Sequence, residues 1–111
     1  EVTFIARGEH LRAIQENGLR VESVHGDFTV APAQATDDPT AAGAVDLVLF
    51  ATKTYHIDDA VRTMRPLVGP QTAILPLQNG VDASERVAAI LGPDPVLGGV
   101  TYVSSYRAAP G

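Results

Sequence analysis

The sequence lacks cysteine and tryptophan, and it has only one methionine. Without cysteine the chain can form neither disulfides nor thiolate metal sites, and its redox compartment is left undetermined. No apolar run approaches the roughly 20 residues that a membrane-spanning helix needs. Basic residues are also scarce, with 8 Lys and Arg against 13 Asp and Glu, and they form no cluster. These absences predict that the protein binds neither a membrane nor nucleic acid.

The composition is that of a folded domain. Of the 111 residues, 45% are hydrophobic and 19% are charged, which is enough apolar surface for a single core. We therefore expect one soluble domain. The chain opens directly on an apolar strand pattern at Val2–Ala6, with no preceding cap or turn. This abrupt start suggests that the chain is a fragment with further sequence upstream.

A strand-helix-strand pattern lies at the centre of the chain. Asp46–Thr52 and Thr72–Leu77 are short apolar runs without alternation, as is typical of parallel strands covered on both faces. Between them, apolar residues from Ile57 to Met64 recur at helical spacing. Parallel strands need such a crossover, which is almost always right-handed.

Polar residues follow both of these predicted strands. Thr52-Lys53-Thr54 comes after the first and Gln78-Asn79-Gly80 after the second. In open parallel sheets, ligands bind beyond the carboxyl ends of the strands. We therefore expect Lys53 and Asn79 to lie at a ligand-binding edge.

The flanking segments complete an alternating α/β pattern. Gly18 is placed to end the first helix, and Asp82 with Glu85 resembles a capping box at the start of the last helix. Gly98 and Gly99 suggest a close backbone approach in the last strand. The predicted elements are a strand at Val2–Ala6, a helix at Glu9–Asn17, a hairpin of Leu19–Val24 with Phe28–Val30, a loop at Ala35–Ala44 with at most one helical turn, a helix from Ala83 to Leu91 and a strand at Val96–Val103.

This alternation predicts a Rossmann-like, doubly wound α/β fold with a mainly parallel sheet and a small β-hairpin insertion. The dinucleotide-binding form of the fold opens with a strand, a Gly-x-Gly-x-x-Gly loop and a helix, all of which are missing here. If Val2–Ala6 is the second strand of that fold, Arg7 occupies the position whose side chain contacts the adenosine ribose of the cofactor. A guanidinium there suits the 2′-phosphate of NADP, while the alternative is an ordinary solvated arginine.

Four stretches together carry a resemblance to a known family. They are VTFIARGEHLRAIQENGLRV, LVLFATKTYHIDDAV, ILPLQNGVD and VLGGVTYVSS, and in this order they resemble the ketopantoate reductases (2-dehydropantoate 2-reductases). The resemblance implies that residues 1–111 are a truncated N-terminal dinucleotide-binding domain, with the C-terminal helical substrate domain absent. It also implies NADPH-dependent reduction of 2-dehydropantoate to pantoate, a step in pantothenate and coenzyme A synthesis.

The resemblance also implies the site residues. Arg7 would bind the 2′-phosphate, Lys53 would lie beside cofactor and substrate, and Ser105, or its neighbour Ser104, would lie against the nicotinamide. Asn79 would contact the nicotinamide ribose and the substrate, and we expect it to be catalytic. Reduction of a ketone develops negative charge on oxygen, and an amide can donate a hydrogen bond to it. The alternatives are a plain turn residue at Asn79 and a surface lysine at Lys53.

Other kinds of site find little support in the sequence. His10, His25 and His56 are far apart on predicted helix starts and a turn, so we expect no metal site. The Asp58-Asp59 pair falls in the first turn of a predicted helix, where carboxylates complement the helix dipole. No Gly-x-Ser-x-Gly elbow indicates a hydrolase.

Three functional alternatives remain open at this point. The parent protein would be a reductase of 2-dehydropantoate, a small 2-oxo acid, while the fragment alone would be inactive because the family's general acid lies in the missing domain. A related NAD(P)-dependent reductase would act on another 2-oxo acid. A non-catalytic fragment would instead self-associate, for instance as a homodimer, through an exposed sheet edge.

Overall fold

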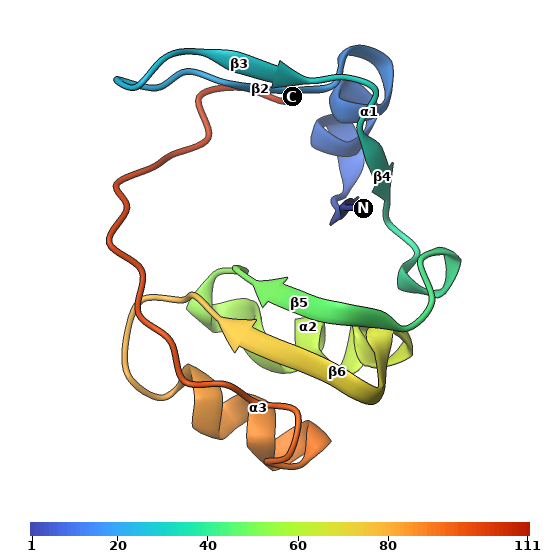
Figure 1. The fold of residues 1–111 in the computed structure, drawn as a ribbon, viewed down its shortest axis with the longest axis vertical. Helices are drawn as coiled ribbons and strands as arrows, with labels where there is room; N and C mark the ends of the chain where they lie inside the picture. Colours follow the sequence, from blue (N-terminus) through green and yellow to red (C-terminus); the bar gives the residue numbers. More distant parts are fainter. The chain divides into compact units, whose positions relative to one another are not determined.

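The computed structural model describes all 111 residues and divides the chain into two compact units (Figure 1). Unit 1 comprises Glu1–Ala41 and Ser104–Gly111, and unit 2 comprises Ala42–Val103. No helix in either unit is long and apolar enough to cross a lipid bilayer. The secondary structure is α/β, as the sequence predicts.

Unit 1 contains two small sheets and one long helix. Strands β1 and β4 pair in parallel, whereas β2 and β3 form the antiparallel hairpin predicted from the sequence. Its elements are β1 (Thr3–Ile5), α1 (Gly8–Asn17), β2 (Leu19–Val21), β3 (Phe28–Val30), β4 (Gln34–Thr36) and the 3₁₀ helix η1 (Pro39–Ala41).

Helix α1 buries one face and ends where the sequence predicts. Leu11 and Ile14 are its buried residues. Gly18 follows with a positive φ of 83°, and its N–H donates to the Ile14 carbonyl at 2.9 Å. A Cβ at Gly18 would also collide with the Val30 carbonyl of the hairpin. Both the left-handed backbone and this close approach require glycine.

Strand β4 corrects the loop predicted over Ala35–Ala44. It is only three residues long, too short to show a period in the sequence, and its pairing with β1 defines it. The chain then turns at Asp38, whose Oδ1 accepts hydrogen bonds from the Thr40 hydroxyl at 2.7 Å and from its N–H at 2.9 Å. The hydrogen bond from the Thr40 hydroxyl, and to a lesser extent that from the Thr40 N–H, lowers the pKa of Asp38 below its ordinary value.

Unit 2 contains the predicted strand-helix-strand pattern. Strands β5 and β6 pair in parallel, in register from Leu47 opposite Ala73 to Phe50 opposite Pro76. Between Val45 and Leu47 the register shifts, so that β6 bulges at its start. The elements of unit 2 are β5 (Val45–Phe50), the 3₁₀ helix η2 (Thr54–His56), α2 (Ile57–Thr63), the 3₁₀ helix η3 (Arg65–Leu67), β6 (Val68–Pro76) and α3 (Ala83–Leu91).

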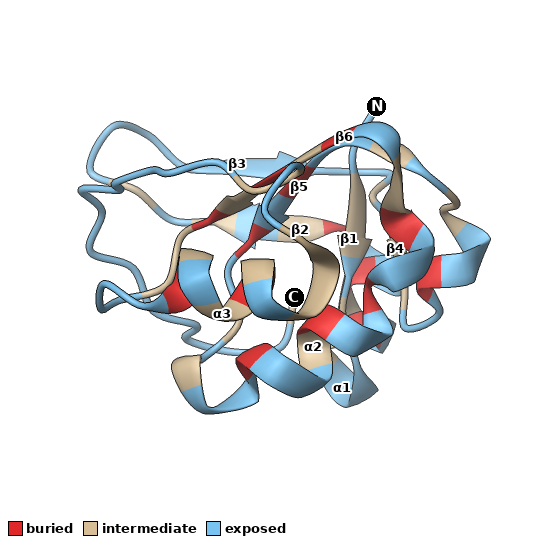
Figure 2. Cartoon of the chain, turned by 90° about the horizontal axis from the view of Figure 1, so that it is seen from below, coloured by how far each residue is buried: buried red, intermediate tan, exposed pale blue.

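The core of unit 2 lies between its strands and helices α2 and α3. Ile57, Val61, Ile74 and Val87 are completely buried there. Burial of such residues from two helices and a strand supplies most of the apolar surface removed from water, and Figure 2 shows these buried positions along the same elements. The full cluster is Val48, Phe50, Ile57, Val61, Met64, Leu67, Ile74, Ala83 and Val87.

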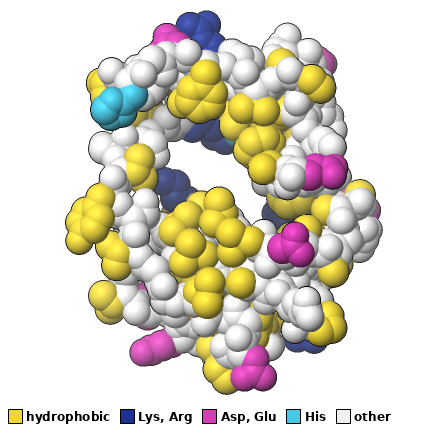
Figure 3. Space-filling model, viewed as in Figure 1, with side chains coloured by type: hydrophobic (Ala, Val, Ile, Leu, Met, Phe, Trp, Pro, Cys, Tyr) yellow, Lys and Arg dark blue, Asp and Glu magenta, His cyan; other side chains and the backbone are white.

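The opposite face of β5 is exposed, contrary to the prediction of a strand covered on both faces. Val48 and Phe50 point into the core, but Leu47 is 48% exposed and Leu49 is 60% exposed. Hydrophobic side chains accordingly gather on the surface over β5 in Figure 3. The continuous apolar run does form a parallel strand. Helices α2 and α3 both pack against the side of β5 that carries Val48 and Phe50, so the other side is left exposed.

The strand predicted at Val96–Val103 is wrong except at its start. Val96 forms a single parallel bridge with Ile74, and the Leu97 N–H donates to the Ile74 carbonyl at 2.8 Å. Beyond Leu97 the chain is irregular. Gly98 and Gly99 follow, and glycine disfavours a strand because it loses the most conformational entropy. A Cβ at Gly98 would meet no atom, so the predicted close approach is found at Gly99 alone, where a Cβ would collide with the Leu75 side chain.

The capping box predicted at the start of α3 does not form. Asp82 is the N-cap residue, but its φ of −101° and ψ of −6° are helical, and its side chain caps no N–H group. A capping side chain usually needs an extended backbone to reach the N2 or N3 amide. Gly92 does end the helix as predicted, with a φ of 88°.

Candidate functional site

The carboxyl ends of β5 and β6 lie side by side. Phe50 and Pro76 are opposite each other at the last register position, and the Leu77 N–H donates to the Phe50 carbonyl at 2.8 Å. The polar segments that follow the two strands therefore leave the sheet from one edge. This arrangement brings Lys53 and Asn79 to the same edge, as the sequence predicts.

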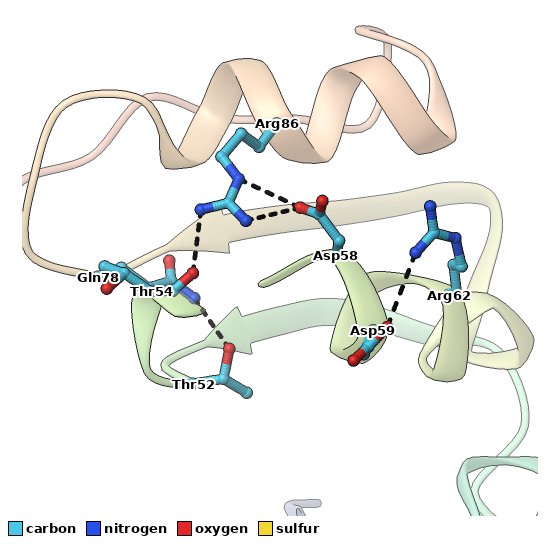
Figure 4. A network of polar contacts seen from close by, with 7 residues as sticks. All are labelled: Thr52, Thr54, Asp58, Asp59, Arg62, Gln78 and Arg86. Carbon is cyan, nitrogen blue, oxygen red and sulfur yellow. Dashed lines mark hydrogen bonds and ion pairs between the residues drawn. The ribbon is translucent and has the colours of Figure 1, made fainter. Parts of the chain in front are cut away.

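Gln78 joins the two strand ends at this edge. Its Nε2 atom donates to the Thr52 hydroxyl at 3.5 Å, a long hydrogen bond (Figure 4). Its Oε1 atom is buried and has no hydrogen-bond partner. Unpaired buried acceptors are uncommon in proteins, and this one is shut off from solvent.

Lys53 and Asn79 are exposed beside this edge. Lys53 is the extended N-cap residue of η2, and its ammonium makes no ion pair within the chain. Asn79 is exposed and precedes Gly80, whose φ of 100° forms the tight turn predicted from the sequence. A cation and a neutral amide that both face solvent can together receive an anionic, hydroxyl-bearing ligand.

The other two predicted site residues belong to unit 1. Arg7 follows β1 and is the extended N-cap residue of α1, with its side chain exposed. Ser105 lies in the irregular segment that begins unit 1's C-terminal part. It was predicted to follow a strand end, and this placement is wrong because the strand stops near Leu97. The roles of Arg7 and Ser105 stay predictions.

A surface hollow in unit 2 does not coincide with this edge. It is lined by residues 44–46 and 69–72, at the amino end of β5 and the bulge of β6. The most buried polar group there, the Thr72 hydroxyl, already bonds to the Gly69 N–H and the Val45 carbonyl. The hollow therefore offers no free buried polar group to a ligand, and the polar strand ends remain the candidate site.

The sequence did not reveal the ion pair that borders the site. Arg86 of α3 reaches across to Asp58 in the first turn of α2 and to the carbonyl of Thr54, directly after Lys53 (Figure 4). The sequence by itself explains Asp58 by the helix dipole alone. Arg86 and Asp58 are 28 positions apart, and no local pattern signals a pair at that separation.

Solved structures of similar fold carry this arrangement of elements. The 2-dehydropantoate 2-reductase of Porphyromonas gingivalis is 45% identical with a TM-score of 0.92, and it matches 100% of this chain and 39% of its own. The enzyme of Geobacter metallireducens is 38% identical with a TM-score of 0.91 over 98% of this chain and 36% of its own. The fold and its polar sheet edge define a Rossmann-like α/β domain of an oxidoreductase.

Sequence comparison identifies the family. The family model described as ketopantoate reductase PanE/ApbA matches residues 1–111, and the chain belongs to this family. The 2-dehydropantoate 2-reductase of Pyrococcus horikoshii is 34% identical over 111 residues, covering 100% of this chain and 35% of the relative. The 2-dehydropantoate 2-reductase of Mesorhizobium japonicum is 31% identical over 131 residues, which cover 100% of this chain and 40% of the relative. The chain thus spans little more than a third of these relatives.

Proposed function

We propose that the protein carrying this chain reduces 2-dehydropantoate to pantoate with NADPH, in the synthesis of pantothenate and coenzyme A. The observation that carries the proposal is that the strands preceding Lys53 and Asn79 end side by side, at the carboxyl edge of the β5–β6 pair, in a chain of this family. Residues 1–111 would be the dinucleotide-binding domain, and the remaining length of a relative-sized protein would supply the substrate domain. Such a reductase would work in the cytoplasm.

The residues present fit a dinucleotide. Lys53 and Arg7 are cations without an ion-pair partner in the chain, which suits phosphate groups. When bound, NADPH supplies the hydride. In the proposal Arg7 binds the 2′-phosphate, and Ser105 lies near the nicotinamide.

Asn79 and Lys53 have the chemical roles in this proposal. The Asn79 amide donates a hydrogen bond toward the substrate oxygen as negative charge develops there, and it also orients the ribose. The Lys53 ammonium stabilises the substrate's carboxylate and the same developing charge. A general acid from outside this chain delivers the proton, so the 111 residues alone do not turn over substrate.

The experiment is a comparison of NADPH and NADH in the full-length protein with 2-dehydropantoate. Wild type should prefer NADPH. Arg7→Ala should raise the KM for NADPH by about tenfold or more, the usual cost of one charge-assisted hydrogen bond, and leave the KM for NADH unchanged. The matched control is Arg12→Ala, which removes another exposed arginine, on helix α1 of the same unit.

Two results would contradict the proposal. One is the absence of NADPH oxidation with 2-dehydropantoate but brisk oxidation with another 2-oxo acid, which would keep the enzyme class and change the substrate. The other is an equal effect of Arg7→Ala on both cofactors, which would leave Arg7 an ordinary solvated arginine.

A further inference from the structure

Arg86 connects helix α3 to the segment that carries Lys53. Its Nε and Nη2 atoms donate to Oδ1 of Asp58 at 3.1 and 2.7 Å, and its Nη1 atom donates to the Thr54 carbonyl at 2.9 Å (Figure 4). One guanidinium therefore holds both the first turn of α2 and the residue after Lys53. A guanidinium is suited to this because its donors are planar and fixed relative to one another.

The segment between β5 and α2 has few other restraints. Within it, the His56 N–H donates to the Lys53 carbonyl at 2.9 Å, and the Ile57 N–H donates to the Thr54 carbonyl. The Lys53 side chain itself is exposed. Among the side-chain hydrogen bonds from outside, only that of Arg86 reaches Lys53, Thr54, Tyr55 or His56. Arg86 is therefore the one side chain from outside that holds the segment from Lys53 to His56 by a hydrogen bond.

A second ion pair, which lies entirely on helix α2, differs from the Arg86–Asp58 pair in its exposure and contacts. Arg62 and Asp59 are 3.7 Å apart, with side chains 64% and 88% exposed, and this arginine touches no loop carbonyl. The Arg86 and Asp58 side chains are 33% and 51% exposed, so solvent screens their interaction less. Helices α2 and α3 also pack through Ile57, Val61 and Val87, so their contact does not depend on Arg86.

We propose that Arg86 is a positioning residue for Lys53: its hydrogen bonds to Thr54 and Asp58 hold the segment from Lys53 to His56 so that the Lys53 ammonium is presented at the ligand edge. The cofactor part of this proposal rests on the proposed function. Arg86 itself touches no reacting group, and its effect on NADPH binding passes through Lys53.

The test combines loop exchange with cofactor affinity in the full-length protein. In Arg86→Gln, hydrogen exchange of peptides covering residues 51–57 should become about tenfold faster, while β6 peptides keep their rates; tenfold corresponds to about 1.4 kcal/mol. The Kd for NADPH, measured by fluorescence titration, should rise by about the same factor. Arg62→Gln, the matched control, should change neither quantity.

The conservative variant separates positioning from stability. Arg86→Lys keeps the charge that faces Asp58, but a single ammonium lacks the fork that reaches Asp58 and the Thr54 carbonyl together. Any Tm that Arg86→Gln loses should largely return in this variant, while exchange at residues 51–57 stays fast and NADPH still binds weakly.

Three outcomes would overturn the positioning role. They are unchanged loop exchange in Arg86→Gln, an equal acceleration in Arg62→Gln, and an acceleration spread evenly over β5, β6 and α3, which would indicate general destabilisation. If wild type itself bound no NADPH, the proposed function would fail instead, and the exchange rates would still decide whether Arg86 holds the segment.

Discussion

Asn79 can be a chemical group or only a turn former, and the two roles respond differently to substitution. Its side chain is exposed, and the turn is completed by Gly80 with a φ of 100°. A turn role needs only a residue that tolerates the turn backbone, which glycine does. A chemical role needs the amide donor, which neither glycine nor alanine supplies.

Both Asn79→Ala and Asn79→Gly should therefore lower kcat of the full-length reductase. We expect a loss of about 100-fold, the usual effect of removing a donor aimed at a developing oxyanion. The KM for NADPH should change less than kcat. The measurement is steady-state kinetics with NADPH and 2-dehydropantoate.

Asp82→Ala is the control for this experiment. Asp82 is an exposed residue just beyond the same turn, and its side chain caps no amide. It should retain the wild-type kcat. Wild-type kcat in Asn79→Gly would show that Asn79 serves the turn alone.

At the scale of the element, Thr72 fixes the irregular start of β6. It is the buried polar residue of the chain, 6% exposed. Its hydroxyl accepts a hydrogen bond from the Gly69 N–H at 2.8 Å and donates to the Val45 carbonyl, across the register shift between β5 and β6. These two bonds satisfy backbone groups that the bulge removes from the regular ladder.

Thr72→Val should destabilise the protein by about 1 to 3 kcal/mol, because the nearly isosteric side chain leaves these buried backbone groups unpaired. Thr72→Ser keeps the hydroxyl and should cost less. Urea unfolding measures the difference, provided that the m-value stays constant. Wild-type stability in Thr72→Val together with a loss in Thr72→Ser would instead assign the role of Thr72 to packing of its methyl group.

The elements also show how far the sequence could be interpreted. Strands β5 and β6 and the helix between them were predictable because continuous apolar runs and helical spacing are local signals. Strand β4 was not, since three residues show no period and only pairing with β1 defines it. At the candidate site, the side-by-side strand ends before Lys53 and Asn79 followed from parallel topology. Arg86 had no such signal, because its partner is distant in sequence.

At the scale of the whole molecule, the two units differ in how much apolar surface they bury. In unit 1 the buried large hydrophobic residues are Leu11 and Ile14, whereas unit 2 contains a contiguous cluster of nine buried residues. Apolar periodicity could not anticipate this difference, nor the exposed Leu47 and Leu49, because it predicts which residues prefer burial and not what covers them. Self-association through an exposed sheet edge stays a prediction.

This difference predicts unequal local stability within the chain. Because opening free energy follows buried apolar contacts, amides of β5 and β6 should exchange more slowly with solvent than those of β2 and β3. Ile74→Ala removes side-chain atoms from the fully buried centre of unit 2 and should cost about 2 to 5 kcal/mol. Exchange measured by NMR should then accelerate in β5, β6, α2 and α3.

The amides of α1 serve as the internal control, since Ile74 belongs to unit 2 and α1 to unit 1. If each unit opens by itself, exchange in α1 keeps its wild-type rate in Ile74→Ala. Equal acceleration in α1 and β6 would instead mean that the 111 residues open in one cooperative step, and the division into two units would then describe contacts without describing stability.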